Sequence, residues 1–194
     1  MLKNSILVLI FIGLVRISSN AQLHESFSDG NFTTNPTWIG DTSYWKIVGQ
    51  QLNSNAPPTS SSAQLCTRNN LSQNVVWEFY VNLKFATSSV NYTDIFLISD
   101  SANLMGLNSG IFVRIGNTND EISLYRKDTG AITKLIDGID GRLASTSSNS
   151  FKIRVSRDLN NLYELYDDAS GTGNNFVLEG TVHENNYPSK FWSF

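Results

Sequence analysis

Apolar and polar residues alternate along much of this chain with a period of two, which is typical of β-strands with one buried face. In the range 75–83, Trp77 and Phe79 fall on one side, whereas Glu78 and Tyr80 fall on the other. Similar patterns predict further strands over 22–27, 45–48, 63–67, 92–99, 111–115, 122–127, 131–136, 151–156, 162–167 and 176–182. No stretch of ordinary helix length carries apolar residues at the i, i+3, i+4 spacing of an amphipathic helix.

Turn-forming residues separate these strands at intervals of about 8–12 residues, as in sandwich folds. Glycine, asparagine and aspartate gather at 116–120, 127–130, 157–161 and 167–175. The range 92–99 has apolar residues on both faces, which predicts a central strand. The pattern therefore indicates an all-β fold, namely one antiparallel two-sheet β-sandwich of the jelly-roll type.

The first 21 residues have the layout of a secretory signal peptide. Lys3 supplies a positive start, the range 6–15 is an apolar run, and Ser19 and Ala21 are small residues at the −3 and −1 positions of a cleavage site. The run is too short to span a membrane, and no later segment approaches its length. We expect a bacterial protein that is secreted or held at the cell surface, with a mature domain over 22–194.

Cleavage is predicted after Ala21, so that the mature chain begins at Gln22. The small side chains at −3 and −1 fit the pockets of a signal peptidase. N-terminal sequencing of the exported protein checks this, and a start well away from Gln22 would contradict it.

The composition of the chain excludes some classes of binding partner and an intrachain disulfide. The net charge is −3 and the pI about 5.3, and lysine and arginine form no cluster, so neither a nucleic acid nor an anionic membrane surface is an expected partner. Cys66 is the single cysteine, which excludes an intrachain disulfide and predicts a small buried residue in its strand.

The chain ends on an aromatic segment, Phe191–Phe194, where a strand begins and stops. We expect a truncated gene product or an incomplete record that lacks further C-terminal strands; the alternative is a terminal strand that docks by itself. An unpaired sheet edge should then lie beside these residues, and the chain should associate through it.

Eight blocks, taken as an ordered set, resemble one family across nearly the whole mature chain. They are Glu25–Asp41, Gln51–Pro57, Trp77–Val81, Phe112–Gly116, Glu121–Arg126, Ile136–Gly138, Arg154–Asp158 and Leu178–Val182. The set is similar to the N-terminal domain of bacterial surface proteins that carry lamin-tail domains and a type IX secretion tail. This resemblance implies a concanavalin A-like lectin/glucanase (laminin-G-like) jelly roll. The family's downstream domains are missing here, so we expect that the chain belongs to a longer surface protein.

Glucanases of the resembled fold place carboxylates at alternating positions of one strand, and no strand here does so. One pair remains open: if the strands of Glu78 and Asp94 were neighbours, their carboxylates would lie about 5 Å apart, near the separation of a retaining glycosidase. His24 and His183 lie at opposite ends of the domain, which supports neither a zinc site nor a Ser-His-Asp triad.

A calcium site is weakly indicated by Asp137 and Asp140, whose carboxylates lie in a tight glycine-containing loop. Ordinary turn chemistry explains the same residues. No other cofactor is expected.

A sugar-binding face is the main functional hypothesis, because aromatic rings stack on sugars while polar groups bind their hydroxyls. Its candidate residues lie on the strand faces opposite the core residues: Glu78, Tyr80, Asp94, Phe112, Arg114 and Tyr125. We therefore interpret the chain as an exported, non-catalytic module that binds a glycan or polysaccharide or acts in adhesion. Two alternatives stay open, a cryptic glycoside hydrolase that uses Glu78 and Asp94, and a purely structural spacer.

Overall fold

The computed structural model describes residues 23–193 except 58, 60, 186 and 188. The predicted signal peptide and its cleavage site between Ala21 and Gln22 lie outside the described residues. Within them, no helix has both the length and the apolar composition that crossing a membrane requires.

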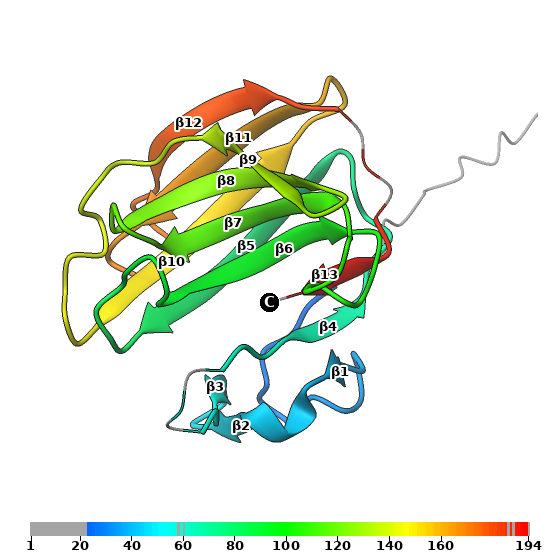
Figure 1. The fold of residues 1–194 in the computed structure, drawn as a ribbon, viewed down its shortest axis with the longest axis vertical. Coiled ribbons are helices and arrows are strands. Elements are labelled where there is room, and N and C mark those ends of the chain that lie inside the picture. The colour runs from blue at the N-terminus through cyan, green and yellow to red at the C-terminus, as the bar shows by residue number, and fades with distance from the viewer. Residues whose placement is uncertain (1–22, 58, 60, 186, 188, 194) are drawn as a thin grey trace, which may run out of the picture.

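Two antiparallel sheets face each other and form a β-sandwich, as predicted (Figure 1). The seven-stranded sheet has the order β1 (Ile39–Gly40), β4 (Leu65–Arg68), β13 (Phe191–Ser193), β6 (Tyr92–Ser99), β7 (Gly110–Gly116), β8 (Glu121–Asp128) and β9 (Ala131–Ile136). The four-stranded sheet has the order β12 (Val177–His183), β11 (Leu162–Asp168), β10 (Asn149–Arg157) and β5 (Val75–Leu83). A short 3-10 helix, Thr42–Tyr44, leads into a separate hairpin of β2 (Trp45–Val48) and β3 (Gln51–Ser54).

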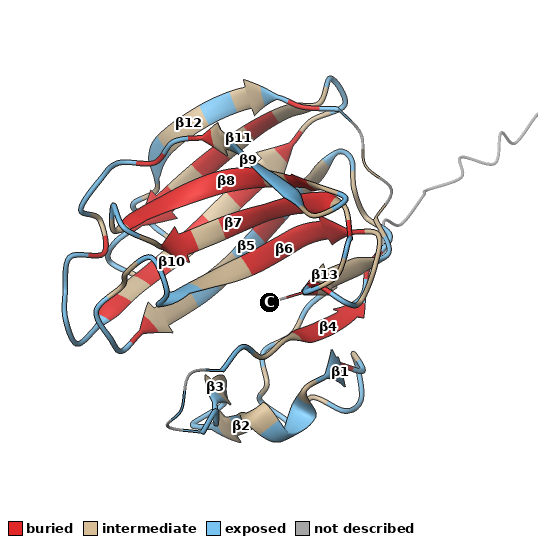
Figure 2. Cartoon of the chain, in the orientation of Figure 1, coloured by how far each residue is buried: buried red, intermediate tan, exposed pale blue. Residues whose placement is uncertain are grey.

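The core lies between the two sheets, where strands such as β7 and β10 contribute alternate residues. The residues that fill it include Ile111, Val113 and Ile115 from β7 and Ile153 and Val155 from β10. Strands β7 and β8 are buried along most of their length on both faces, as Figure 2 shows. The other face of the seven-stranded sheet is therefore covered in part, and it carries a second, smaller apolar cluster.

The C-terminal strand β13 is an interior strand of the seven-stranded sheet. Trp192 is paired with Thr67 of β4, and Phe191 is paired on its other side with Ser99 of β6. The predicted unpaired edge beside Phe191 is therefore wrong, because β13 has a neighbour on each side. The aromatic residues of this segment contribute to packing, since Trp192 packs against Trp38 and the core.

The predicted strand over 22–27 is also wrong for its described part, since residues 23–27 form no strand. Glu25 holds this segment in another shape: its carboxylate accepts hydrogen bonds from the Phe27 amide and from Trp38 Nε1. Two other predictions are confirmed, because β6 is a central strand and Cys66 is buried in β4.

Candidate functional site

The outer side of the seven-stranded sheet, here called the front face, brings together four of the six predicted site residues. Because Ile111, Val113 and Ile115 point into the core, Phe112 and Arg114 of β7 point to the front. The strand register places three further side chains beside them. Asp94 of β6 lies opposite Arg114, Tyr125 of β8 lies opposite Phe112, and Lys134 of β9 lies opposite Tyr125.

Arg114 and Asp94 form a bidentate ion pair at the centre of the front face. Arg114 Nε is 2.8 Å from Asp94 Oδ1, and Nη2 is 2.8 Å from Oδ2. The guanidinium carbon also lies 4.1 Å from the ring centre of Tyr92 and 5.3 Å from that of Tyr125. These contacts hold the guanidinium in one plane, while Nη1 makes no hydrogen bond to another described residue.

The pair is recessed but open to solvent. The Arg114 side chain is 14% exposed and that of Asp94 is 22% exposed. Burial raises the pKa of Asp94, and the hydrogen bonds and charge of Arg114 act against that rise. Tyr92 is more accessible, at 38% exposed, and stands at the rim of the recess.

A loop covers the neighbouring part of the front face. Leu104, from the connection between β6 and β7, packs on the cluster of Phe96, Phe112 and Tyr125. Lys127 Nζ fastens this loop through hydrogen bonds to the carbonyl oxygens of Leu104 (2.7 Å) and Gly106 (3.0 Å).

The rings beneath the loop form a stacked row. Phe112 lies between Phe96, at a ring-centre distance of 4.7 Å, and Tyr125, at 5.3 Å. Phe112 is completely buried, so its expected role in stacking on a sugar is wrong. The ring supports Arg114 from below instead, with the guanidinium carbon 5.5 Å from its centre.

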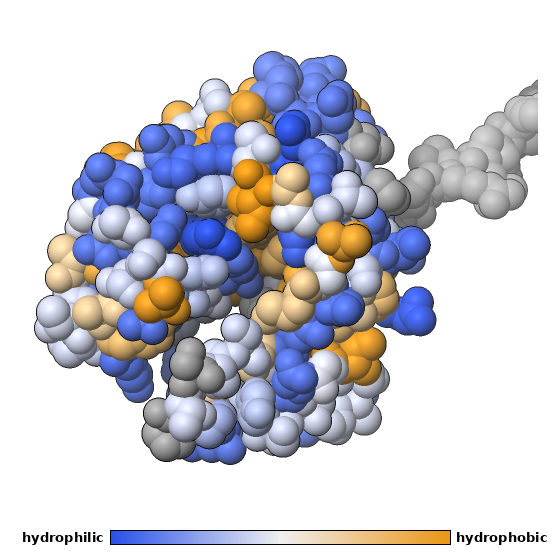
Figure 3. Space-filling view, viewed as in Figure 1, coloured by the Kyte–Doolittle hydropathy of each residue, from blue (hydrophilic) through white to orange (hydrophobic). Residues whose placement is uncertain are grey.

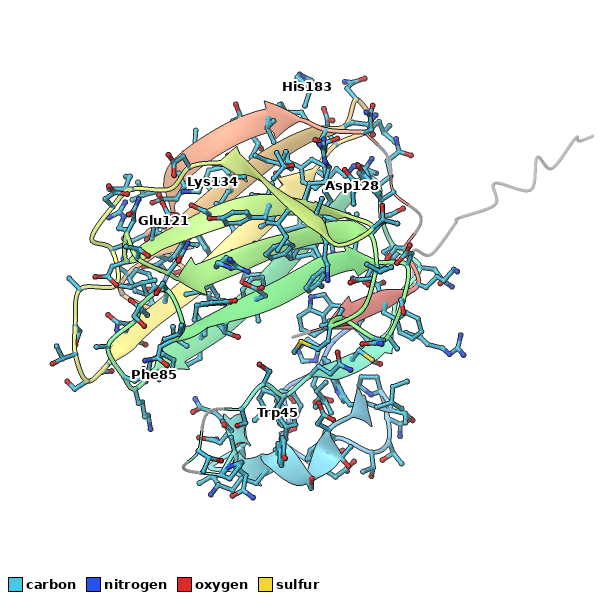
Figure 4. All side chains as sticks on the ribbon, viewed as in Figure 1. Trp45, Phe85, Glu121, Asp128, Lys134 and His183 are labelled. Atoms are coloured by element: carbon cyan, nitrogen blue, oxygen red, sulfur yellow. The ribbon has the colours of Figure 1, made fainter. Side chains whose placement is uncertain are left out.

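A second charged group lies beside the tyrosine, where Glu121 and Lys134 face each other on β8 and β9 (Figure 4). Lys134 Nζ is 2.6 Å from Glu121 Oε1 and is also paired with Asp137. Burial disfavours the charge on Lys134, but the hydrogen bonds to Asp137 and Glu121 outweigh it and raise the pKa of Lys134. This group therefore keeps a cation at the edge of the recess.

The space-filling view shows the front face hollowed between the segment that carries β2 and β3 and the strands β6–β8 (Figure 3). Hydrophilic side chains gather in the hollow, and hydrophobic side chains stand at several points around it. The recess therefore combines a fixed ion pair with an accessible ring, Tyr92. Such a recess is suited to hydrogen bonding with hydroxyl groups rather than to enclosing an apolar ligand.

Glu78 and Tyr80 do not join this group. Both lie on β5 in the four-stranded sheet, on the opposite outer side of the sandwich, here called the back face. There Glu78 pairs with Lys152 and Arg154, and the Tyr80 hydroxyl is hydrogen-bonded to Ser150. The predicted assembly of all six residues on one face is therefore wrong.

The same topology contradicts the hypothesis that Glu78 and Asp94 form the carboxylate pair of a glycosidase. The strands of Glu78 and Asp94 belong to different sheets, and the two carboxylates lie on opposite outer faces of the sandwich. Each carboxylate is paired with arginine on its own face. No catalytic role therefore follows from this pair.

The loop of Asp137 and Asp140 gives calcium no support. The Asp137 carboxylate is paired with Lys134, and Asp140 makes no hydrogen bond to another described residue. Nowhere in the described ranges do three or more histidine, cysteine, aspartate or glutamate side chains gather in a way that would hold a metal ion.

Sequence reasoning missed three contributors to the front face: Tyr92, Leu104 and Lys134. Tyr92 shares strand parity with Asp94, so the alternation over 92–99 already contained its signal. The position of Leu104 depends on the path of the loop between β6 and β7, which the sequence pattern does not give. The position of Lys134 depends on the register between β8 and β9.

Comparison with known proteins supports the fold. No family model and no curated protein matches the chain. Among solved structures, the carbohydrate-binding module CBM66 from Bacillus subtilis is similar with a TM-score of 0.55 and 9% identity, covering 80% of this chain and 85% of that one. The Emp46p carbohydrate recognition domain in its potassium-bound form has a TM-score of 0.54 and 12% identity, covering 88% and 86%. The structural similarity shows that the chain shares a jelly-roll-like sandwich with these proteins, and at such low sequence identity it shows the fold alone. The narrower resemblance to lamin-tail surface proteins stays a prediction.

Proposed function

We propose that this chain is an exported, non-catalytic carbohydrate-binding module and that its ligand lies in the front-face recess over Arg114 and Asp94. One observation carries the proposal, which is the bidentate ion pair recessed among aromatic rings on the hollowed side of a lectin-like sandwich. The two similar structures are a carbohydrate-binding module and a carbohydrate recognition domain, which favours the same class of ligand.

The chemistry of the recess matches that of a sugar. Nη1 of Arg114 is available to donate to a hydroxyl oxygen, and the Asp94 carboxylate retains lone pairs that accept from hydroxyl groups. Both groups are already held in one orientation, so a ligand would lose little affinity to their ordering. Tyr92 offers the ring against which the apolar side of a sugar would pack.

The arrangement of carboxylates on the front face favours binding without hydrolysis. Asp94 is committed to Arg114, and the carboxylate proposed as its catalytic partner lies on the back face. A retaining or inverting glycosidase needs two carboxyl groups that flank one bond.

The test is the binding of the mature domain to neutral and acidic plant and algal polysaccharides, measured by affinity electrophoresis and calorimetry. Arg114→Lys keeps the charge and removes the planar fork. We expect it to weaken binding about ten- to hundredfold, because a hydrogen bond to a charged group contributes about 1.5–3 kcal/mol. Tyr92→Ala should weaken binding through the lost ring contact.

The back face provides a matched control. Arg154 also pairs with a carboxylate, Glu78, and lies 3.8 Å from the ring centre of Phe176. Arg154→Lys should leave polysaccharide binding unchanged. Binding that is lost in Arg154→Lys and kept in Arg114→Lys would place the ligand on the back face, whereas no binding to any polysaccharide would favour a spacer.

A further inference from the structure

Two carboxyl groups are buried together where the loop after β9 crosses the end of the four-stranded sheet. Asp167 of β11 lies on the same side of its strand as the core residues Tyr163 and Leu165, and Glu179 lies on the neighbouring strand β12. The side chain of Asp167 is 1% exposed and that of Glu179 is 0% exposed. Neither residue belongs to the front face or to the candidate site residues predicted from the sequence.

Hydrogen-bond donors are distributed unequally between the two groups. Glu179 Oε2 accepts from the Ile139 amide at 2.6 Å, and Oε1 accepts from Arg142 Nε at 3.1 Å. The Asp167 carboxylate accepts no hydrogen bond from any described residue, and its closest cation is Arg142 Nη2 at 3.5 Å. A single guanidinium therefore faces two buried carboxylates, and both its Nε and its Nη2 lie nearer to Glu179 than to Asp167.

Such an arrangement is costly when both carboxyl groups are ionised. An uncompensated buried charge destabilises a protein strongly, and two carboxylates at one site commonly retain one proton between them. Burial, followed by the contact with Glu179, raises the pKa of Asp167 to about 7.

We infer that Asp167 is protonated in the folded chain, and that its proton keeps the loop over residues 137–142 docked on the sandwich. With the proton in place, the Asp167 hydroxyl donates to Glu179, which continues to bind the Ile139 amide and Arg142. The same loop reaches β8, where the Gly138 amide donates to Ser123 Oγ. Loss of the proton to solvent leaves two charges against one guanidinium and loosens the loop.

Among the described residues, Arg142 is the one cation within 4.0 Å of either carboxylate, so no second cation replaces the proton there. The charged groups that act most on Asp167 are Glu179 from β12, Arg142 from the loop and Asp168 beside it on β11. Strand β10 places Ile153 opposite Asp167. Asp168 adds negative charge, since hydrogen bonds from Ser170 and from the amides of its own turn lower its pKa.

The direction of the pH effect follows from linkage. Because the pKa of Asp167 is higher in the folded chain than in the unfolded chain, the folded chain binds more protons between these two values. The contribution to stability is full below the ordinary aspartate pKa of about 3.9 and is lost as the pH rises to about 7. Over that window, one proton changes the folding equilibrium constant by up to about tenfold per pH unit.

The experiment compares unfolding by denaturant at pH 5 and pH 8 for the wild type and Asp167→Asn. The asparagine amide donates to Glu179 as the protonated carboxyl does, but it does not titrate. Relative to Asp167→Asn, the wild-type folding equilibrium constant should fall about a hundredfold between pH 5 and pH 8. The protection of the Ile139 amide against hydrogen exchange, corrected for the base-catalysed intrinsic rate, should fall over the same range in the wild type alone.

Asp140→Asn is the control, because it removes one exposed carboxylate from the same loop and should keep the wild-type pH profile. Equal pH profiles for the wild type and Asp167→Asn would overturn the inference. Carboxyl-carbon NMR of the wild type needs no variant: an Asp167 signal that titrates below pH 5 would also overturn it. Stabilisation at pH 8 by millimolar Ca²⁺ in the wild type, absent in Asp167→Asn, would assign the pair to a cation instead.

Discussion

Replacing Trp192 with alanine is expected to lower the free energy of unfolding by about 3–5 kcal/mol, the range for removing a large aromatic side chain from a packed site. Trp192 sits on β13 between β4 and β6, and its ring centre lies 5.3 Å from that of Trp38. Its loss leaves a cavity at the point where three segments distant in the sequence meet. Unfolding in guanidinium chloride measures the change.

Phe85→Ala serves as the control, because Phe85 is an exposed aromatic residue outside the core and its truncation should cost far less. A loss below about 1 kcal/mol for Trp192→Ala would contradict the interior position of β13. The test bears on the fold alone and requires no ligand.

Gly110→Ala should destabilise the chain by at least about 3 kcal/mol, because the added methyl group has no room. A Cβ atom at Gly110 would lie 2.1 Å from the carbonyl oxygen of Ile98. That oxygen belongs to the backbone of β6 next to its register shift, so relief requires β6 and β7 to separate. Thermal and denaturant unfolding measure the effect.

Gly106→Ala is the matched control for Gly110→Ala. The nearest atoms to a Cβ at Gly106 belong to the side chain of Asn103, which is able to move aside. We expect its free energy of unfolding to stay within about 0.5 kcal/mol of the wild type. Equal losses in both variants would refute the close approach of β6 and β7 at Gly110.

Much of the fold follows from side-chain periodicity. The alternation of Trp77 and Phe79 with Glu78 and Tyr80 correctly predicts which residues of β5 are turned toward the core. The reason is local: in an extended strand, neighbouring side chains must point to opposite sides, whatever the strand pairs with. The central position of β6 follows from the same kind of reasoning, since apolar residues lie on both of its faces.

The sequence correctly predicted which candidate site residues share a face only for strands that belong to the same sheet. Parity correctly groups Asp94, Phe112, Arg114 and Tyr125, since β6, β7 and β8 are consecutive in the chain and also neighbours in the sheet. It fails for Glu78, because β5 is followed in the chain by β6 but pairs with β10 instead. It also fails to predict the burial of Phe112, which depends on how the loop that carries Leu104 is fastened by Lys127.

The sequence by itself therefore determined the all-β class, most of the strands and, within those strands, the face on which each side chain emerges. The tertiary structure alone decided which faces belong to the same side of the sandwich, that β13 is an interior strand, and that Asp167 meets Glu179 beneath the loop over residues 137–142. The physical reason is the range of the interactions. Strand parity is set by backbone geometry between adjacent residues, whereas sheet membership depends on packing and hydrogen bonding between segments far apart in the chain.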